Sequence, residues 1–368
     1  MPEESDWFSR YKFLSPLGQG GMGTVYLAED RSNGNASCVI KQLLNKYTDE
    51  AERVEAVRLF KREVAILRQL RHPGVVRVFD DHTTSDHKYF LVMDYVPGKN
   101  LDVVIADVGV LDSETVVRIA IQCCDVLIYL HSEDIIYRDV KPSNLMLRPD
   151  GRVVFIDFGI ARNFLPKEVA TRVVTAGYSP PEQYFGKPEK RSDIYALGAT
   201  LSHLLTGHRP KPLQVCSPRS INPEILEPLD ELIKKMTAHS VEERPHSAEQ
   251  VKYQLFKIYK SIHPSWEMPE LPPGTAWDEQ DEARLHAELK YAPDKLKERK
   301  PAVASGAFKV PPQALQKSNP HLSREERRAS GIYAEHDART REQSGDTTWF
   351  SKVTVQLKKL MQNMGLGG

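Results

Sequence analysis

The sequence has few cysteines, no net charge and no apolar leader, and each of these features excludes a class of protein. Its four cysteines lack the spacing of metal ligands and fit a reducing compartment. Its 50 basic and 50 acidic residues cancel, whereas a nucleic-acid-binding protein is normally basic. The opening segment MPEESDWFSR is acidic and does not resemble a signal peptide. No apolar run reaches the roughly 18 residues that span a bilayer, so we expect a cytoplasmic protein with no transmembrane segment and no nucleic-acid partner.

The hydrophobic pattern predicts an α+β fold in which strands dominate first and helices follow. Residues 89–96 and 151–158 are short, β-branched and bounded by polar residues, which is typical of buried strands. Apolar side chains recur every three or four positions in longer segments, as they do in amphipathic helices. Ser113 is the expected N-cap of one of these helices. The predicted helices cover residues 50–70, 113–132 and 192–207.

The composition changes near residue 262. Residues 263–345 are rich in Pro, Lys, Glu, Arg and Ser, which predicts a mostly disordered tail. Residues 346–368 place apolar side chains such as Trp349 and Leu357 near helical spacing, with lysines between them, which predicts an amphipathic C-terminal helix. This helix suits a partner protein or an intramolecular docking site, with weak peripheral membrane association as the alternative.

A glycine-rich stretch near the N-terminus is typical of phosphate binding. In LGQGGMGTVYLA, Gly18, Gly20 and Gly23 form a G-x-G-x-x-G pattern, and glycine lets the backbone approach phosphates closely. Dinucleotide-binding folds use the same spacing, but there a helix follows it. Here the strand-like segment TVYLAED follows, which favours a β-hairpin that covers phosphates.

Further along the chain, polar and charged residues stand within apolar segments, where they are costly unless paired. Lys41 lies inside the strand-like segment CVIKQL, and Glu63 on the following helix is its expected anionic partner. The segment IIYRDVKPSNLML holds Asp139, Lys141 and Asn144 at fixed offsets among apolar residues. The segment IDFG places Asp157 at a strand end. Each motif is modest alone, and their order along the chain is the specific signal.

In this order, the motifs resemble those of the eukaryotic-like (Hanks-type) protein kinase family, from about residue 11 to residue 262. The segment SPPEQYFGKPEKRSDIYALGATLSHLLTGHRP is most similar to bacterial serine/threonine kinases. The resemblance implies a bilobal fold, with a small β-rich lobe at 11–96, a larger helical lobe at 97–262 and an N-terminal extension at 1–10. The implied activity is transfer of the γ-phosphate of Mg-ATP to Ser and Thr hydroxyls of proteins, with autophosphorylation, in intracellular signalling.

The resemblance also implies a role for each motif residue, because phosphoryl transfer needs charge neutralisation and in-line positioning. Asp139 would accept or orient the proton of the substrate hydroxyl, Lys141 would steady the transferring group, and Thr175 would brace both. Asn144 and Asp157 would bind Mg²⁺, which prefers hard oxygen ligands. The catalytic set is Asp139, Lys141, Asn144, Lys41, Glu63 and Thr175.

The nucleotide would bind between the glycine loop and the segment MDYV. Lys41 would hold the α- and β-phosphates, Met93 would be the gatekeeper, and the backbone of Asp94 and Val96 would contact the adenine edge. Val39 replaces a more usual alanine and would narrow the adenine pocket. The nucleotide-binding set is Leu17, Gly18, Gly20, Gly23, Val25, Val39, Lys41, Met93, Asp94, Val96 and Met146.

Other positions matched by the resemblance concern anchoring and regulation. Glu182 and Arg244 would form a buried ion pair, and Asp193 would tie the central helix to the loop that contains Asp139. Thr171 is the candidate phosphorylation switch, since a phosphate there would add charge for Arg138 to bind. A second candidate phosphosite is the serine of RRAS, Ser330.

Three alternative functions stay open at the level of sequence. A catalytically inactive scaffold usually lacks the strand lysine, the catalytic aspartate or a metal aspartate, whereas Lys41, Asp139 and Asp157 are all present. A small-molecule phosphotransferase of related fold generally lacks the long segment between Asp157 and Glu182 and the lysine after the catalytic aspartate. In the third alternative, the tail is the main functional element and the kinase domain regulates it.

Overall fold

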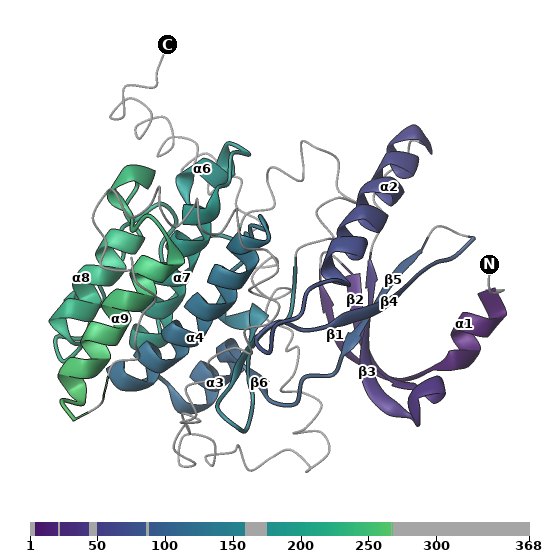
Figure 1. Ribbon diagram of the computed structural model, residues 1–368, viewed down its shortest axis with the longest axis horizontal. Coiled ribbons are helices and arrows are strands. Elements are labelled where there is room, and N and C mark those ends of the chain that lie inside the picture. The colour runs from purple at the N-terminus through teal and green to yellow at the C-terminus, as the bar shows by residue number, and fades with distance from the viewer. Residues whose placement is uncertain are drawn as a thin grey trace.

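The computed structural model describes residues 4–20, 23–43, 50–85, 88–158, 175–265 and 267. Figure 1 shows a β-rich lobe next to a larger helical lobe, with the long helix α2 (Glu50–Leu67) in the β-rich lobe. This arrangement agrees with the predicted order of strands before helices. Residues 263–265 and 267 of the predicted tail at 263–345 are described, and the rest of it lies outside the described residues, as does the predicted helix at 346–368.

The smaller lobe is built on an antiparallel sheet of five strands in the order β1-β2-β3-β5-β4. Side chains alternate across it, as the pleat of a strand requires. Val39 and Leu43 of β3 pack into the main core, whereas Cys38 and Ile40 face a separate cluster. The strands are β1 (Tyr11–Gly20), β2 (Gly23–Asp30), β3 (Ala36–Leu43), β4 (Val78–Thr83) and β5 (Tyr89–Asp94).

Helix α1 (Glu4–Arg10) covers that second face of the sheet, on the side away from α2 (Figure 1). Trp7 is only 6% exposed, and its ring stacks on His82 with the centroids 4.7 Å apart. Arg10 donates two hydrogen bonds, of 2.9 and 2.7 Å, to the buried carboxylate of Asp30. These bonds hold the pKa of Asp30 below its usual value. Residues 4–10 of the predicted N-terminal extension therefore form a helix that packs against the sheet.

Helix α2 packs on the opposite face through Phe60, Val64 and Leu67. It ends at Leu67, three residues before the predicted end at residue 70. The short 3-10 helix η1 (Arg31–Asn33) connects β2 to β3 and begins after Asp30, whose side chain accepts a hydrogen bond from the backbone N–H of Ser32.

The larger lobe is organised around α4 (Ser113–Ser132), which packs against α7 (Lys190–Thr206), α9 (Ala248–Ile262) and the small sheet. Its N-cap is Asp112 rather than the predicted Ser113, because the Asp112 carboxylate accepts the backbone N–H of Thr115 at 2.8 Å. Among the described helices, α4 alone is long and apolar enough to span a membrane, and 61% of its most apolar window is buried inside the lobe. It is therefore the core helix of this lobe.

The remaining elements surround α4 and α7. A three-stranded sheet has the order β6-β7-β8 and faces the smaller lobe. Strand β8 is shorter than the predicted strand 151–158, because residues 148–152 form the turn of the β7–β8 hairpin. These elements are β6 (Lys99–Asn100), α3 (Leu101–Val108), η2 (Pro142–Asn144), β7 (Leu145–Leu147), β8 (Val153–Phe155), α6 (Pro181–Tyr184), η4 (Pro218–Ser220), α8 (Glu227–Met236) and η5 (Val241–Glu243).

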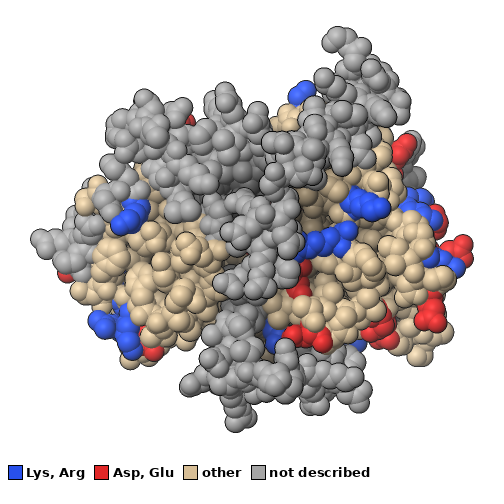
Figure 2. Space-filling model, turned by 180° about the vertical axis from the view of Figure 1, so that it is seen from behind, with Lys and Arg blue, Asp and Glu red and all other residues tan. Residues whose placement is uncertain are grey.

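The charged surface is mixed in sign. Figure 2 shows the molecule from behind, where basic and acidic side chains of the described residues lie interspersed between other residues. Many are exposed ion pairs, such as Arg77 with Asp94 at 3.0 Å. Exposed pairs of this kind contribute about 0–1 kcal/mol each to stability, so the fold depends mainly on the buried contacts described above.

Candidate active site

The glycine-rich segment forms the β1–β2 hairpin, as the sequence predicted. Gly20 and Gly23 are paired at its end, and the two residues between them lie outside the described part of the chain. Gly23 has φ +145°, and a Cβ there would lie 1.8 Å from the carbonyl oxygen of Gln42. Glycine is therefore required at position 23 by the close approach of β3 as well as by its backbone conformation.

Lys41 joins the two lobes through Asp157. Its Nζ donates to both carboxylate oxygens of Asp157, at 2.7 and 2.8 Å. The Lys41 side chain is 11% exposed and that of Asp157 is 31% exposed. Glu63, the expected partner, lies half-buried on α2. In this structure the ammonium is paired with Asp157, and its pairing with Glu63 stays a prediction.

Asp139, Lys141, Asn144 and Thr175 come together in the larger lobe. The Asn144 amide nitrogen donates to Oδ2 of Asp139 at 2.8 Å, and the Thr175 hydroxyl donates to Oδ1 at 2.9 Å. The Nζ of Lys141 lies 3.3 Å from Oδ2 of Asp139 and 3.4 Å from the Thr175 hydroxyl. Both carboxylate oxygens of Asp139 are thus oriented by neighbours, and the expected contacts of Thr175 with Asp139 and Lys141 are confirmed.

The loop that carries Asp139 is held by the central helix. The Asp193 carboxylate on α7 accepts the backbone N–H groups of Tyr137 at 2.9 Å and Arg138 at 2.7 Å. Asp193 is fully buried, and His131 of α4 also contacts it at 2.9 Å. Arg138 has φ +66°, a conformation that costs a non-glycine residue about 1–3 kcal/mol. These two hydrogen bonds offset that cost, and the expected tie between Asp193 and the loop is confirmed.

Asn144 and Asp157 are brought together by the β7–β8 hairpin. The backbone N–H of Ile156, the residue before Asp157, donates to the carbonyl of Asn144 at 3.1 Å, so Asn144 and Asp157 lie at the same end of the hairpin. The Tyr137 hydroxyl accepts the backbone N–H of Asp157 at 3.3 Å. Burial raises the pKa of Tyr137 well above its usual value, so its hydroxyl is neutral. An amide oxygen and a carboxylate at this point are donors that suit Mg²⁺.

Most of the predicted adenine-site side chains share one apolar cluster. Leu17, Val39, Met93 and Met146 are buried in it, and Val25 packs against it. Val39 and Met93 face each other as register partners on β3 and β5.

A cavity of about 10 Å³, the size of one water, lies beside Met93 of this cluster. Met93, Lys41 and Asp157 are among the residues that line it. Next to Met93 in the chain, the backbone N–H of Asp94 donates to the carbonyl of Arg77 at 3.0 Å. Val96 is half-buried.

Comparison with known proteins agrees with this geometry. The sequence model of the family described as "Protein kinase domain" matches residues 11–257. The chain belongs to the protein kinase family. A solved structure named "PpkA-294 apo form" shares the fold, with a TM-score of 0.58 at 21% identity, and the likeness covers 67% of this chain and 96% of that one.

Bacterial kinases are among its relatives. The chain is 35% identical over 262 residues to serine/threonine-protein kinase B of Synechocystis, which covers 66% of this chain and 45% of the relative. It is 36% identical over 217 residues to PknA of Nostoc, covering 56% and 38%, and 33% identical over 263 residues to PrkC of Bacillus subtilis, covering 67% and 40%. The chain therefore spans less than half the length of these relatives.

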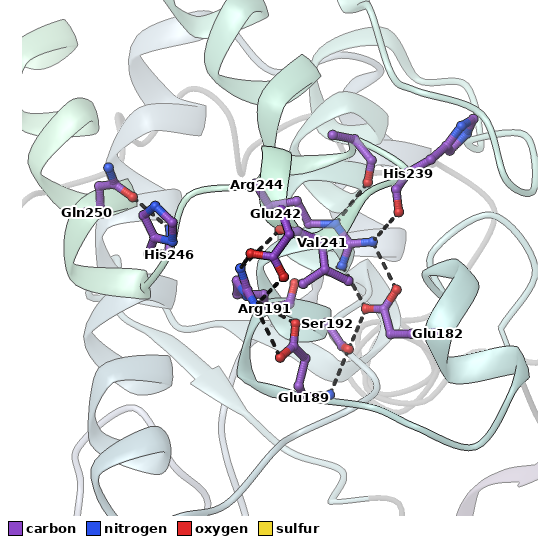
Figure 3. A network of polar contacts seen from close by, with 11 residues as sticks. Glu182, Glu189, Arg191, Ser192, His239, Val241, Glu242, Arg244, His246 and Gln250 are labelled. Atoms are coloured by element: carbon purple, nitrogen blue, oxygen red, sulfur yellow. Dashed lines mark hydrogen bonds and ion pairs between the residues drawn. The ribbon is translucent and has the colours of Figure 1, made fainter. Parts of the chain in front are cut away.

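Helix α6 is anchored by a buried ion pair, which was also expected. Arg244, whose side chain is fully buried, donates to both carboxylate oxygens of Glu182 at 2.7 and 2.9 Å. Figure 3 shows Glu182 also accepting the Ser192 hydroxyl, at 2.6 Å, next to the pairs that Arg191 makes with Glu189 and Glu242. The candidate phosphosites Thr171 and Ser330 lie outside the described residues.

Sequence reasoning missed two contacts of this kinase site. It gave Tyr137 no role, yet the Tyr137 hydroxyl accepts the backbone N–H of Asp157. It assigned no role to Gln183, whose amide reaches the carbonyl of Arg138 at 3.1 Å. No pattern in the sequence signals either contact, because each joins segments that meet only in the folded lobe.

Proposed function

We propose that the protein transfers the γ-phosphoryl group of Mg-ATP to serine and threonine hydroxyls of protein substrates, its own chain included. The observation that carries this proposal is the single polar network that joins Asp139 to Lys141, Asn144 and Thr175. A carboxylate, an amide oxygen and an ammonium held together in a partly enclosed site suit phosphoryl transfer, because that reaction depends on positioning and on neutralising charge.

In the proposed reaction, Asp139 accepts the proton of the substrate hydroxyl. The hydroxyl oxygen forms a bond to the γ-phosphorus as the bond from that phosphorus to the bridging oxygen of ADP breaks. Hydrogen bonds from Thr175 and Asn144 keep the Asp139 carboxylate in one orientation during this step. Lys141, which lies 3.3 Å from the carboxylate, neutralises charge on the transferring group.

ATP would lie between the lobes. Lys41 would bind its α- and β-phosphates, with Glu63 as the partner that holds the ammonium. The adenine ring would pack between Leu17, Val25, Val39 and Met146, with its edge at the backbone of Asp94 and Val96. The buried cluster around Met93 supports this site.

Mg²⁺ would be held by Asn144 and Asp157, and when bound it would neutralise phosphate charge. The described residues contain no group of three or more His, Cys, Asp or Glu side chains arranged for a metal. Mg²⁺ usually takes one or two carboxylates from the protein and completes its shell with phosphates and water, and Asp157 would supply such a carboxylate.

Regulation is the second part of the proposal. We propose that phosphorylation of Thr171 switches the enzyme on, because the Arg138 side chain beside Asp139 is exposed and would bind the phosphate. Ser330 is a further proposed phosphosite. The helix at 346–368 would bind a partner or the kinase domain itself, in a cytoplasmic protein with at most weak membrane association.

Phosphosite mapping tests the activity directly. Purified protein is incubated with Mg-ATP and a generic protein substrate, beside an Asp157→Ala variant, and phosphorylated residues are identified by mass spectrometry. We expect phosphoserine and phosphothreonine in the wild type only. If both proteins and the substrate stayed unmodified, while the wild type still bound ATP, the scaffold alternative would replace this proposal.

A further inference from the structure

Helix α6 holds two neighbouring polar side chains that bind in different directions. Glu182 binds Ser192 of α7 and Arg244, which follows η5 (Figure 3). Gln183, the next residue, is 6% exposed and binds the loop that carries Asp139. Its amide nitrogen donates to the carbonyl of Arg138 at 3.1 Å and to the Ser179 hydroxyl at 3.3 Å. Both hydrogens of this amide nitrogen are therefore used.

The first of these bonds acts on the backbone next to Asp139. Arg138 adopts φ +66°, which is uncommon for a residue with a side chain. Asp193 binds the N–H of Arg138 at 2.7 Å, and Gln183 binds its carbonyl. The carbonyl of Arg138 belongs to the peptide plane that also contains the nitrogen of Asp139. The two hydrogen bonds thus fix the chain on both sides of the Arg138 Cα and set the direction in which Asp139 leaves it.

The second bond acts on Asp139 through Thr175. The Ser179 hydroxyl accepts the backbone N–H of Thr175 at 3.1 Å, and the amide of Gln183 holds that same hydroxyl oxygen. Thr175 in turn donates its own hydroxyl to Oδ1 of Asp139 at 2.9 Å. Gln183 thus contacts both segments that converge on the carboxylate.

We propose that Gln183 is a positioning residue that orients Asp139, through the Arg138 carbonyl and through Ser179 and Thr175. This inference rests on the proposed kinase activity. Gln183 follows Glu182 on α6, and Glu182 is anchored to Arg244. A displacement of α6 would therefore move Gln183 and change the direction of Asp139. The role requires a side chain with two amide hydrogens at this length: glutamate supplies no donor when ionised, and methionine has a similar length without a donor.

The test compares Gln183→Met with Gln122→Met as a matched control. Gln122 is a half-buried amide that binds backbone groups, since it donates to the carbonyls of Gly151 at 3.1 Å and Arg118 at 3.5 Å and accepts the N–H of Val153 at 3.0 Å. It lies on α4 beside the β7–β8 turn and makes no contact with the Asp139 network among the described residues. We expect Gln183→Met to lower kcat by about 10- to 100-fold, since a small misplacement of a reacting group can cost about that much.

In the same variant the KM for ATP should stay within about twofold, because the expected defect concerns orientation of Asp139 rather than nucleotide binding. Gln122→Met should keep the wild-type kcat even where the melting temperatures of the two variants fall alike. If the wild type were active and Gln183→Met were equally active, the positioning role alone would be overturned. Equal losses of kcat in Gln183→Met and Gln122→Met would overturn it as well. A wild type that transfers no phosphate would overturn the proposed kinase activity, and the positioning role with it.

Discussion

The two halves of the site are built in different ways. In the larger lobe, Asp139 is 7% exposed and receives hydrogen bonds on both carboxylate oxygens, while its loop is tied to the fully buried Asp193. In the smaller lobe, Lys41 extends from a sheet strand and meets Asp157 of the other lobe through one ion pair. One half is therefore assembled within a single core, and the other depends on how the two lobes lie against each other.

This difference separates two tasks of the site. One is the orientation of Asp139, the proposed proton acceptor, and the other is the positioning of the nucleotide. The bonds that orient Asp139 lie within one lobe, so we expect them to form independently of nucleotide. The Lys41–Asp157 pair uses two groups that the proposed reaction needs for phosphate and Mg²⁺, so we expect nucleotide binding to rearrange it. We expect ligands to change the smaller-lobe half of the site much more than the larger-lobe half.

The largest effect should follow from removing the Asp139 carboxylate of the larger lobe. Asp139→Asn loses the proton acceptor, and general-base catalysis contributes about 10²- to 10⁴-fold to rates. We expect kcat to fall by that factor while the affinity for ATP, measured by calorimetry, changes little. Asp134→Asn is the control, because Asp134 precedes the same loop and its side chain is 90% exposed. A kcat within about tenfold of the wild type would show that Asp139 does not act as the base.

The second effect concerns the anchor of α6. Glu182→Gln leaves the buried guanidinium of Arg244 without its charge partner, and breaking a buried ion pair typically costs about 3–5 kcal/mol. We expect a loss of this size in the free energy of unfolding from urea denaturation. Glu242→Gln is the matched control: Glu242 is 77% exposed in its pair with Arg191, so its loss should destabilise the protein much less than the loss of Glu182. Equal losses in both variants would contradict the anchor.

The third effect concerns α1 and sharpens the comparison, because it targets the smaller lobe alone. Trp7→Ala should destabilise the protein by about 3 kcal/mol, the lower end of the range for a large buried aromatic side chain. Phe8→Ala, one residue further on, should cost much less because Phe8 is 41% exposed. Thermal unfolding of both variants measures the difference. If Trp7→Ala melted like the wild type, the packing of α1 would contribute little to the stability of the lobe.

Local patterns in the sequence predicted the elements that carry them. The apolar helix at residues 113–132 was confirmed to the residue, since its periodic side chains are buried where the pattern indicated. Its N-cap was wrong by one residue, because Asp112 and Ser113 are both good caps and only the backbone geometry selects Asp112. The ion pair of Glu182 with Arg244 was confirmed because the family motif includes both residues.

Contacts between distant segments could not be predicted in the same way. Helix α1 has seven residues and no apolar repeat, and Trp7 is buried by residues such as His82 and Phe90 far along the chain. The partner of Lys41 depends on the placement of one lobe against the other, which no local pattern encodes. Gln183 was overlooked for the same reason, since the carbonyl it binds lies 45 residues earlier in the chain.

Hydrogen exchange followed by mass spectrometry, with and without a non-hydrolysable Mg-ATP analogue, tests the central difference most directly. Amides held by buried groups exchange slowly because they need a large opening to reach water. We predict that peptides covering residues 136–146 exchange slowly without nucleotide and change little when it is added, whereas peptides covering residues 11–43 become more protected. If residues 136–146 exchanged fast and slowed only with nucleotide, the claim that the larger-lobe half of the site forms independently of nucleotide would be contradicted.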